Sequence, residues 1–258
     1  MGYQTIRYAE EGGIATVTLD RPEVMNALNR AMRAEITEAV TRAAATARVI
    51  VLTGTGRAFS SGQDLADPSL GADFDVGRVL AEEYEPMLRA IVAARVPVIA
   101  AVNGTAAGAG ANLALAADVV IAAESASFIQ AFTRIGLIPD AGGTWVLPRT
   151  VGLARAMGAA LFAEKVSARQ AADWGMIWEA VPDPEFEAHW RARAAALAAG
   201  PGEALARVKI ALRAAFGNGL DDQLALEAQL QGECGATADF REGVAAFLEK
   251  RPALFTGR

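Results

Sequence analysis

The stretch Val102-Asn103-Gly104-Thr105-Ala106-Ala107-Gly108-Ala109-Gly110-Ala111-Asn112 predicts a buried strand that runs into a small-residue loop, within which a helix begins. The first N–H groups of a helix have no partner inside it and attract negatively charged oxygen, and small residues let a ligand approach the backbone. One interpretation is therefore half of an oxyanion hole, meaning backbone N–H groups that bind such an oxygen. The other is tight packing of a helix on a sheet. The dinucleotide fingerprint G-x-G-x-x-G is absent.

The surrounding sequence predicts an α/β fold with a helical second half. Residues 96–117 carry no charge and could span a bilayer by length, but their proline, glycines and asparagines favour a strand, a loop and a helix. Strands are expected at 14–19, 49–52, 98–102 and 119–121, and helices at 29–47 and 82–94, which is typical of a right-handed parallel arrangement. Further helices are expected at 153–162, 167–174, 184–199, 203–216, 220–233 and 239–250.

Composition excludes several classes of protein. Hydrophobic residues make up 53% and charged residues 21% of the 258 residues, so a disordered chain is excluded. The single cysteine, Cys234, and the single histidine, His189, exclude a disulfide framework and metal sites built from cysteine or histidine clusters. A net charge of −6 without a basic tract disfavours nucleic acid as a partner. The N-terminal residues lack an apolar core of signal-peptide length, so a cytoplasmic, non-membrane protein is expected.

Two further segments could carry chemistry. The loop of residues 56–65 also follows a buried strand, and either offers a second converging N–H group or is an ordinary connection. In the segment 128–145, Asp140 is the only carboxylate between Ser125 and Ala163. A lone carboxylate among apolar residues has a raised pKa that suits a general base. The alternative is an aspartate that caps a helix or forms a turn.

These three segments, in this order and spacing, resemble the crotonase (enoyl-CoA hydratase/isomerase) superfamily. The resemblance covers nearly the whole chain, from Asp20-Arg21-Pro22 with Asn26-Ala27-Leu28 to Arg241-Glu242-Gly243 with Phe247-Leu248-Glu249-Lys250-Arg251. Within that superfamily, residues 128–145, 174–178 and 255–258 are most similar to the ring-1,2-epoxyphenylacetyl-CoA isomerases of phenylacetate breakdown.

The resemblance implies a spiral of ββα turns over residues 1–195 and a helical trimerisation region over residues 196–258. The expected assembly is a homotrimer or a dimer of trimers. The expected substrate is an acyl-coenzyme A thioester, with no separate cofactor because coenzyme A is part of the substrate.

The resemblance also implies the residues of the site. The backbone N–H groups of Gln63 and Ala109 form the oxyanion hole, and Asp140 falls where some isomerases of the family keep their catalytic aspartate. The substrate-binding positions that it implies are Ala58, Ser60, Asp64, Leu65, Gly108, Phe132, Phe247 and Lys250, the last two often acting across a subunit boundary. From the residues alone, Phe247 and Lys250 read as an ordinary amphipathic helix.

The chain departs from the hydratases of the family at two positions. Their two catalytic glutamates fall on Asn112 and Phe132, neither of which can act as an acid or base near neutral pH. This favours an isomerase that uses Asp140 alone, acting on 1,2-epoxyphenylacetyl-CoA or shifting a Δ3 double bond of an enoyl-CoA to Δ2. Phe132, with Ile129 and Ile138, is expected to line a dry apolar pocket.

Three alternatives remain open on sequence grounds. They are an enoyl-CoA hydratase of broad or low activity, a dehalogenase of the same fold that would need His189 as its base, and a non-catalytic CoA-binding scaffold. Trp145 and Trp178 are expected in the core rather than in a pocket wall. Cys234 is expected to be structural.

Overall fold

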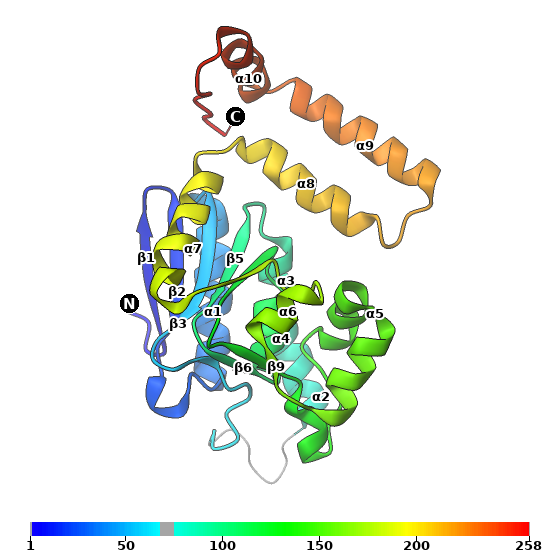
Figure 1. Ribbon diagram of the computed structural model, residues 1–258. Helices are drawn as coiled ribbons and strands as arrows, with labels where there is room; N and C mark the ends of the chain where they lie inside the picture. The colour runs from blue at the N-terminus through cyan, green and yellow to red at the C-terminus, as the bar shows by residue number, and fades with distance from the viewer. Residues whose placement is uncertain (1, 68–74, 258) are drawn as a thin grey trace.

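Two β-sheets form the centre of the computed structural model, which describes residues 2–67 and 75–257 (Figure 1). The larger sheet has the strand order β1-β2-β3-β5-β7-β10 and the smaller has the order β4-β6-β8-β9. The strands are β1 (Ile6–Glu11), β2 (Ile14–Leu19), β3 (Val49–Gly54), β4 (Ala58–Ser60), β5 (Val98–Val102), β6 (Thr105–Ala107), β7 (Val119–Ala123), β8 (Ser127–Ile129), β9 (Val166–Ser167) and β10 (Glu179–Val181).

The chain visits the two sheets alternately, which makes a spiral. The successive pairs β3 and β4, β5 and β6, and β7 and β8 each place one strand in the larger sheet and one in the smaller. Pairing is parallel throughout these turns, whereas the β1–β2 and β8–β9 pairs are antiparallel. The apolar run of residues 98–102 is buried at every position, as expected for a strand that is covered on both faces. The predicted spiral fold is confirmed.

Helices cover the larger sheet. Helix α1 (Arg30–Thr46) packs on β1, β2 and β3, while α7 (Asp183–Ala198) packs on β2, β3 and β7. Figure 1 shows α7 in front of this sheet and α1 behind it. Helix α1 begins at Asn29, whose side chain accepts a hydrogen bond from the N–H of Met32 at 2.9 Å. The helices of this part are η1 (Pro22–Val24), α1 (Arg30–Thr46), α2 (Val76–Val79), the π-helix η2 (Leu80–Tyr84), α3 (Glu85–Ala93), α4 (Ala109–Leu115), η3 (Ala131–Ile135), α5 (Gly143–Phe162), α6 (Ala168–Asp173) and α7 (Asp183–Ala198).

The last three helices extend away from the sheets (Figure 1). They are α8 (Gly202–Ala214), α9 (Leu220–Gly235) and α10 (Ala238–Glu249). Helix α8 is tied to the core by Asp118, which accepts from Lys209 Nζ and from Arg213 Nη2, both at 2.7 Å. Lys209 Nζ also donates to the carbonyl oxygens of Ala94 at 2.6 Å and Val96 at 2.7 Å, so a cation that is largely buried has several partners.

The structure corrects the predicted burial of two tryptophans and confirms the prediction for the uncharged stretch. Trp145 and Trp178 do not lie in the core of the chain, since they are 48% and 68% exposed, and Arg149 stacks on the Trp145 ring at 4.5 Å. The uncharged stretch 96–117 is divided among β5, β6 and α4, as expected. Within the described ranges, no helix is both long and apolar enough to cross a bilayer. The final residue of the C-terminal motif, Arg258, lies outside the described residues.

Candidate active site

Two loops meet backbone to backbone at the ends of β4 and β6. A Cβ placed on Gly62, which has a φ of +92°, would come within 2.7 Å of the Ala107 carbonyl oxygen and 3.3 Å of the Ala109 nitrogen. A Cβ on Gly110 would lie 2.6 Å from the carbonyl oxygen of Ser60. Both positions therefore require glycine, because any side chain would push the two loops apart. The glycines bring together the two segments that the sequence identified separately.

Two backbone donors on these loops have no hydrogen-bond partner among the described residues. Within residues 2–67 and 75–257, neither the N–H of Gln63 nor that of Ala109 donates a hydrogen bond. The neighbouring donors are engaged: the N–H of Gly62 donates to Ser60 Oγ at 3.2 Å and that of Gly108 to the Ile129 carbonyl at 2.8 Å. A negative oxygen is the natural partner for a pair of such donors, as in an oxyanion hole.

The backbone after Asp140 places its side chain just before helix α5. Ala141 (φ +47°) and Gly142 (φ +81°) both have left-handed conformations, and they turn the chain into α5 at Gly143. A left-handed conformation costs alanine about 1 kcal/mol, so the surrounding contacts have to hold the turn. Two of these contacts are made to the Asp140 carbonyl oxygen, which accepts from Asn112 Nδ2 on α4 at 2.7 Å and from the N–H of Gly143 at 2.8 Å.

The Asp140 carboxyl group does not cap helix α5. Its Oδ1 is buried and has no hydrogen-bond partner in the described part of the chain, and α5 has Gly142 at its N-cap with no side-chain cap. Burial raises the pKa of Asp140 from 3.8 to about 6, opposed only by a hydrogen bond from its own backbone. A carboxyl group with a pKa near neutrality can both accept and return a proton, as general acid–base catalysis requires.

Asn112 and Phe132 occupy the positions at which the resemblance places the hydratase glutamates. Asn112 is 1% exposed, and both polar atoms of its side chain are hydrogen-bonded: Nδ2 donates to the Asp140 carbonyl oxygen, and Oδ1 accepts from Gln130 Nε2 at 2.9 Å. Phe132 is buried, and its Cζ would lie 3.9 Å from a Cβ on Gly108. Neither side chain supplies a proton donor or acceptor of suitable pKa.

The predicted pocket lining is only partly as expected. Ile129 is half-buried and Phe132 is buried, but Ile138 is 76% exposed and does not enclose a pocket within the single chain. The reason is that Ile138 lies in an exposed run of residues 133–138 that leads to Asp140.

The positions predicted near coenzyme A differ in exposure. Ala58 and Ser60 are fully buried. Ser60 Oγ donates to the Asn26 carbonyl oxygen at 2.8 Å, and this hydrogen bond holds the loop of residues 56–65 in place. Asp64 is buried and accepts from Arg21 Nη1 at 2.8 Å. Leu65 is 65% exposed beside it. Their contact with coenzyme A stays a prediction.

Phe247 and Lys250 lie on and just after α10, and Figure 1 shows that helix at the opposite end of the molecule from α4 and β6. Phe247 is 83% exposed. The single chain therefore does not bring these two residues to Asp140.

The single histidine is engaged elsewhere. His189 Nε2 lies 2.8 Å from Glu179 Oε1, and Arg193 Nη2 donates to Glu179 Oε2 at 3.0 Å. His189 is thus part of an ion-pair cluster between α7 and β10. Among the described residues, no group of three or more His, Cys, Asp or Glu side chains could hold a metal ion.

Arg33 and Tyr84 are two residues near the site that were not predicted from the sequence. Both are buried, and both donate to Gln63 Oε1, at 3.0 Å from Arg33 Nη1 and at 2.8 Å from the Tyr84 hydroxyl. A signal was present: Arg33 interrupts an otherwise apolar face formed by Met32, Ile36 and neighbouring residues of α1. A charged residue on such a face needs a buried partner.

The chain belongs to the enoyl-CoA hydratase/isomerase family, whose model matches residues 9–258. Its fold is the crotonase fold, and its activity is of the enoyl-CoA hydratase/isomerase class. The structure of an enoyl-CoA hydratase from Bacillus anthracis superimposes with a TM-score of 0.92 at 31% identity, covering 99% of this chain and 100% of that one.

Two similar proteins carry different activities in their names. The "Probable enoyl-CoA hydratase" of Rhodobacter capsulatus is 68% identical over 100% of both chains. The 1,2-epoxyphenylacetyl-CoA isomerase of Escherichia coli K12 is 47% identical over 96% of this chain and 97% of its own length. The family is thus shown, while the choice between hydration and isomerisation depends on the chemistry of the site.

Proposed function

We propose that the protein is an acyl-CoA isomerase in which Asp140 is the sole acid–base group and the N–H groups of Gln63 and Ala109 bind the thioester oxygen. The observation that carries the proposal is the buried Oδ1 of Asp140, which has no hydrogen-bond partner in the described ranges. It lies in a site where the two hydratase glutamate positions hold Asn112 and Phe132. The similarity to the E. coli isomerase supports the same assignment.

The reaction follows from the residues present. The Asp140 carboxylate takes a proton from the carbon next to the thioester carbonyl, and the electron pair of the broken C–H bond moves into an enolate. The enolate oxygen is held by the two N–H groups, each of which contributes on the order of 3 kcal/mol by analogy with measured oxyanion donors. Asp140 then returns the proton at a second carbon, so the double bond shifts and no water is added.

Phe132 supports this outcome because a buried aromatic ring beside Gly108 keeps water from the reacting carbon. For an epoxide of a phenylacetyl thioester, the same groups would stabilise opening of the three-membered ring into a seven-membered oxygen heterocycle. No cofactor is required for either reaction, since proton transfer and charge stabilisation are provided by the chain.

The test is a comparison of kcat/KM for 1,2-epoxyphenylacetyl-CoA, a 3-enoyl-CoA and crotonyl-CoA. We expect one or both of the first two to be isomerised and hydration of crotonyl-CoA to be at least about 100-fold slower, which is the lower end of what a missing acid–base group costs. Efficient hydration would instead support the second candidate, an enoyl-CoA hydratase, which the similarity to the R. capsulatus protein favours. Binding of coenzyme A esters without any turnover would indicate a scaffold.

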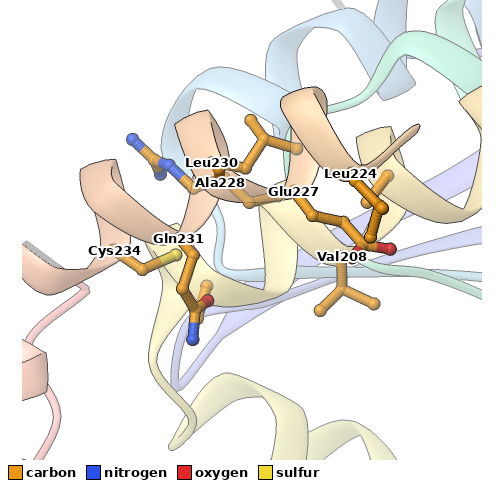
Figure 2. A pocket seen from close by; sticks show the side chains of 10 residues that line it. Val208, Leu224, Glu227, Ala228, Leu230, Gln231 and Cys234 are labelled. Atoms are coloured by element: carbon orange, nitrogen blue, oxygen red, sulfur yellow. The ribbon is translucent and has the colours of Figure 1, made fainter. Parts of the chain in front are cut away.

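We also propose that residues 196–258 form an assembly region through which the chain makes a trimer or a dimer of trimers. A cavity of about 530 Å³ lies between α8 and α9, lined by Val208, Leu224 and Leu230 among others (Figure 2). Val208 and Leu224 are each 52% exposed, so these helices present apolar surface that a second copy would cover. In such an assembly Phe247 and Lys250 would reach the coenzyme A of a neighbouring copy.

Light scattering after size-exclusion chromatography tests the assembly. The wild type is expected at three or six times the chain mass, and Leu224→Asp at a lower mass. Val24→Asp is the matched control, since Val24 is exposed on η1, outside the proposed region. A monomeric wild type would contradict the proposal.

A further inference from the structure

The side chain of Gln63 is held at both of its polar atoms. Its Oε1 accepts from Arg33 Nη1 at 3.0 Å and from the Tyr84 hydroxyl at 2.8 Å, while its Nε2 donates to the Asp64 carbonyl oxygen at 3.0 Å. An amide oxygen has two lone pairs, and both are used here. The side chain therefore cannot rotate without breaking a hydrogen bond.

The two donors are themselves fixed. Arg33 is 1% exposed, donates to Glu83 Oε2 from Nε at 3.0 Å and from Nη2 at 2.5 Å, and donates from Nη1 to the Leu28 carbonyl oxygen at 2.6 Å. Its guanidinium group lies 4.8 Å from the centre of the Tyr84 ring. Tyr84 is 3% exposed and closes the π-helix η2, a geometry that is frequent at functional sites. A rigid, buried pair thus holds Gln63.

The backbone around Gln63 is pinned on both sides. The N–H of Leu28 donates to the Gly62 carbonyl oxygen at 2.7 Å, and the N–H of Asp64 donates to the Leu28 carbonyl oxygen at 3.2 Å. These bonds fix the residues before and after Gln63, whereas the N–H of Gln63 itself has no partner in the described chain. The side-chain contacts supply the remaining constraint on the direction of this N–H.

Tyr84 also lies within electrostatic reach of Asp140. The pKa of Tyr84 is raised first by burial, is lowered by the charge of Arg33, and is raised again by the charge of Asp140. The Tyr84 hydroxyl therefore connects the surroundings of the acid–base group with those of the proposed oxygen-binding N–H.

We propose that Arg33 and Tyr84 are positioning residues which, through the side chain of Gln63, aim its backbone N–H at the thioester oxygen. This inference rests on the proposed function, because it assigns a task to one of the two N–H groups named there. The proposal also gives the glutamine side chain of residue 63 a role. Donation by the backbone N–H alone would not depend on which side chain residue 63 carries.

The test uses Tyr84→Phe and Gln63→Leu in the full-length protein, with Tyr8→Phe as the matched control. Tyr8 also donates a hydroxyl hydrogen bond, to Glu10 at 2.6 Å, but on the exposed strand β1. Tyr84→Phe removes one of the two donors to Gln63 Oε1 and keeps the ring beneath Arg33. Gln63→Leu removes the bonds to both donors and the Nε2 bond to the Asp64 carbonyl oxygen, and leaves the backbone N–H in place.

Two measurements are made on each variant. The first is kcat and KM for the isomerase substrate. The second is the infrared C=O stretch of phenylacetyl-CoA labelled with ¹³C at the thioester carbonyl, a bound probe that reports polarisation of the carbonyl without turnover.

We expect kcat to fall about 5- to 10-fold in Tyr84→Phe, as loss of one hydrogen bond implies, and further in Gln63→Leu. KM should stay within about 2-fold, because the misdirected N–H weakens transition-state binding more than ground-state binding. The carbonyl stretch should move back toward its value in water in both variants, and Tyr8→Phe should match the wild type.

The outcomes separate the two proposals. If bound probe shows no carbonyl shift in the wild type, the oxygen-binding role of Gln63 and Ala109 fails and the proposed function fails with it. If the wild type shows the shift and both variants keep it with unchanged kcat, the positioning role is overturned. Circular dichroism measures the fraction of folded protein in each variant. If activity falls only in proportion to that fraction, and the remaining folded protein keeps the carbonyl shift, the positioning role is also overturned.

Discussion

Replacement of Asp140 by Asn removes the proposed acid–base group while keeping the size of the side chain. Burial raises the pKa of the Asp140 carboxyl to about 6, so in the wild type the carboxylate form increases between pH 5 and pH 7 from roughly one tenth to roughly nine tenths of molecules. Since the reaction begins with the carboxylate, kcat/KM of the wild type should rise about 10-fold across this range and level off above pH 7. Asp140→Asn should lose on the order of 10²–10⁴ in kcat and the pH dependence together.

The same substitution has an expected effect on stability. The folded state holds the proton of Asp140 up to about pH 6, whereas the unfolded chain releases it near pH 3.8, so the folded state loses stability as the pH rises through this window. The full difference is equivalent to at most about 3 kcal/mol, and solvent screening of the half-buried carboxyl group reduces it to about 1 kcal/mol. Asp140→Asn should therefore melt about 2–4 °C above the wild type at pH 7.5 and show no gain at pH 3.5.

Steady-state kinetics from pH 5 to pH 8 and thermal melts at both pH values check these expectations. A variant that is as stable as expected but retains activity within a few-fold would refute the assignment of Asp140. A variant that is inactive and also less stable at pH 7.5 would refute the argument that burial of the Asp140 carboxylate lowers the stability of the folded state at this pH.

Two further substitutions test the surroundings of the site, and a third tests the attachment of α8 to the core. Asn112→Ala removes the 2.7 Å hydrogen bond to the Asp140 carbonyl oxygen and should lower kcat about 5- to 10-fold with little change in KM, as measured by steady-state kinetics. Gly110→Ala places a Cβ 2.6 Å from the Ser60 carbonyl oxygen and should cost about 2 kcal/mol of stability in urea unfolding, with loss of kcat/KM, because the two loops are forced apart. Asp118→Asn leaves the two cations of α8 without their carboxylate and should cost about 3 kcal/mol; an unchanged urea midpoint would show that this contact does not hold α8 to the core.

The buried strands could be predicted because their sequences are continuous apolar runs. Residues 49–52 and 98–102 are buried at every position, as such runs require. The strands of the smaller sheet were missed because three-residue segments such as Thr105–Ala107 are too short to show a period. The exposure of Trp145 was also missed, since residue type alone does not indicate which apolar side chains the single chain leaves uncovered.

Some residues of the candidate site could also be predicted from the sequence, whereas their contacts could not. Asp140 could be selected from sequence because it is an isolated carboxylate, and the two loops could be selected from their glycines. The unpartnered Oδ1, and the contacts of Gln63 with residues 21 and 30 positions away, depend on how the spiral brings distant segments together. Such contacts leave no local pattern, apart from the arginine on the apolar face of α1.

Hydrogen–deuterium exchange at the carbon next to the thioester is the most direct test of proton transfer by Asp140. Phenylacetyl-CoA is incubated in D₂O with enzyme, and loss of the α-proton signal is followed by NMR. We predict exchange catalysed by the wild type and slowed at least about 100-fold in Asp140→Asn. Equal exchange rates in the two proteins, or none with the wild type, would contradict the account.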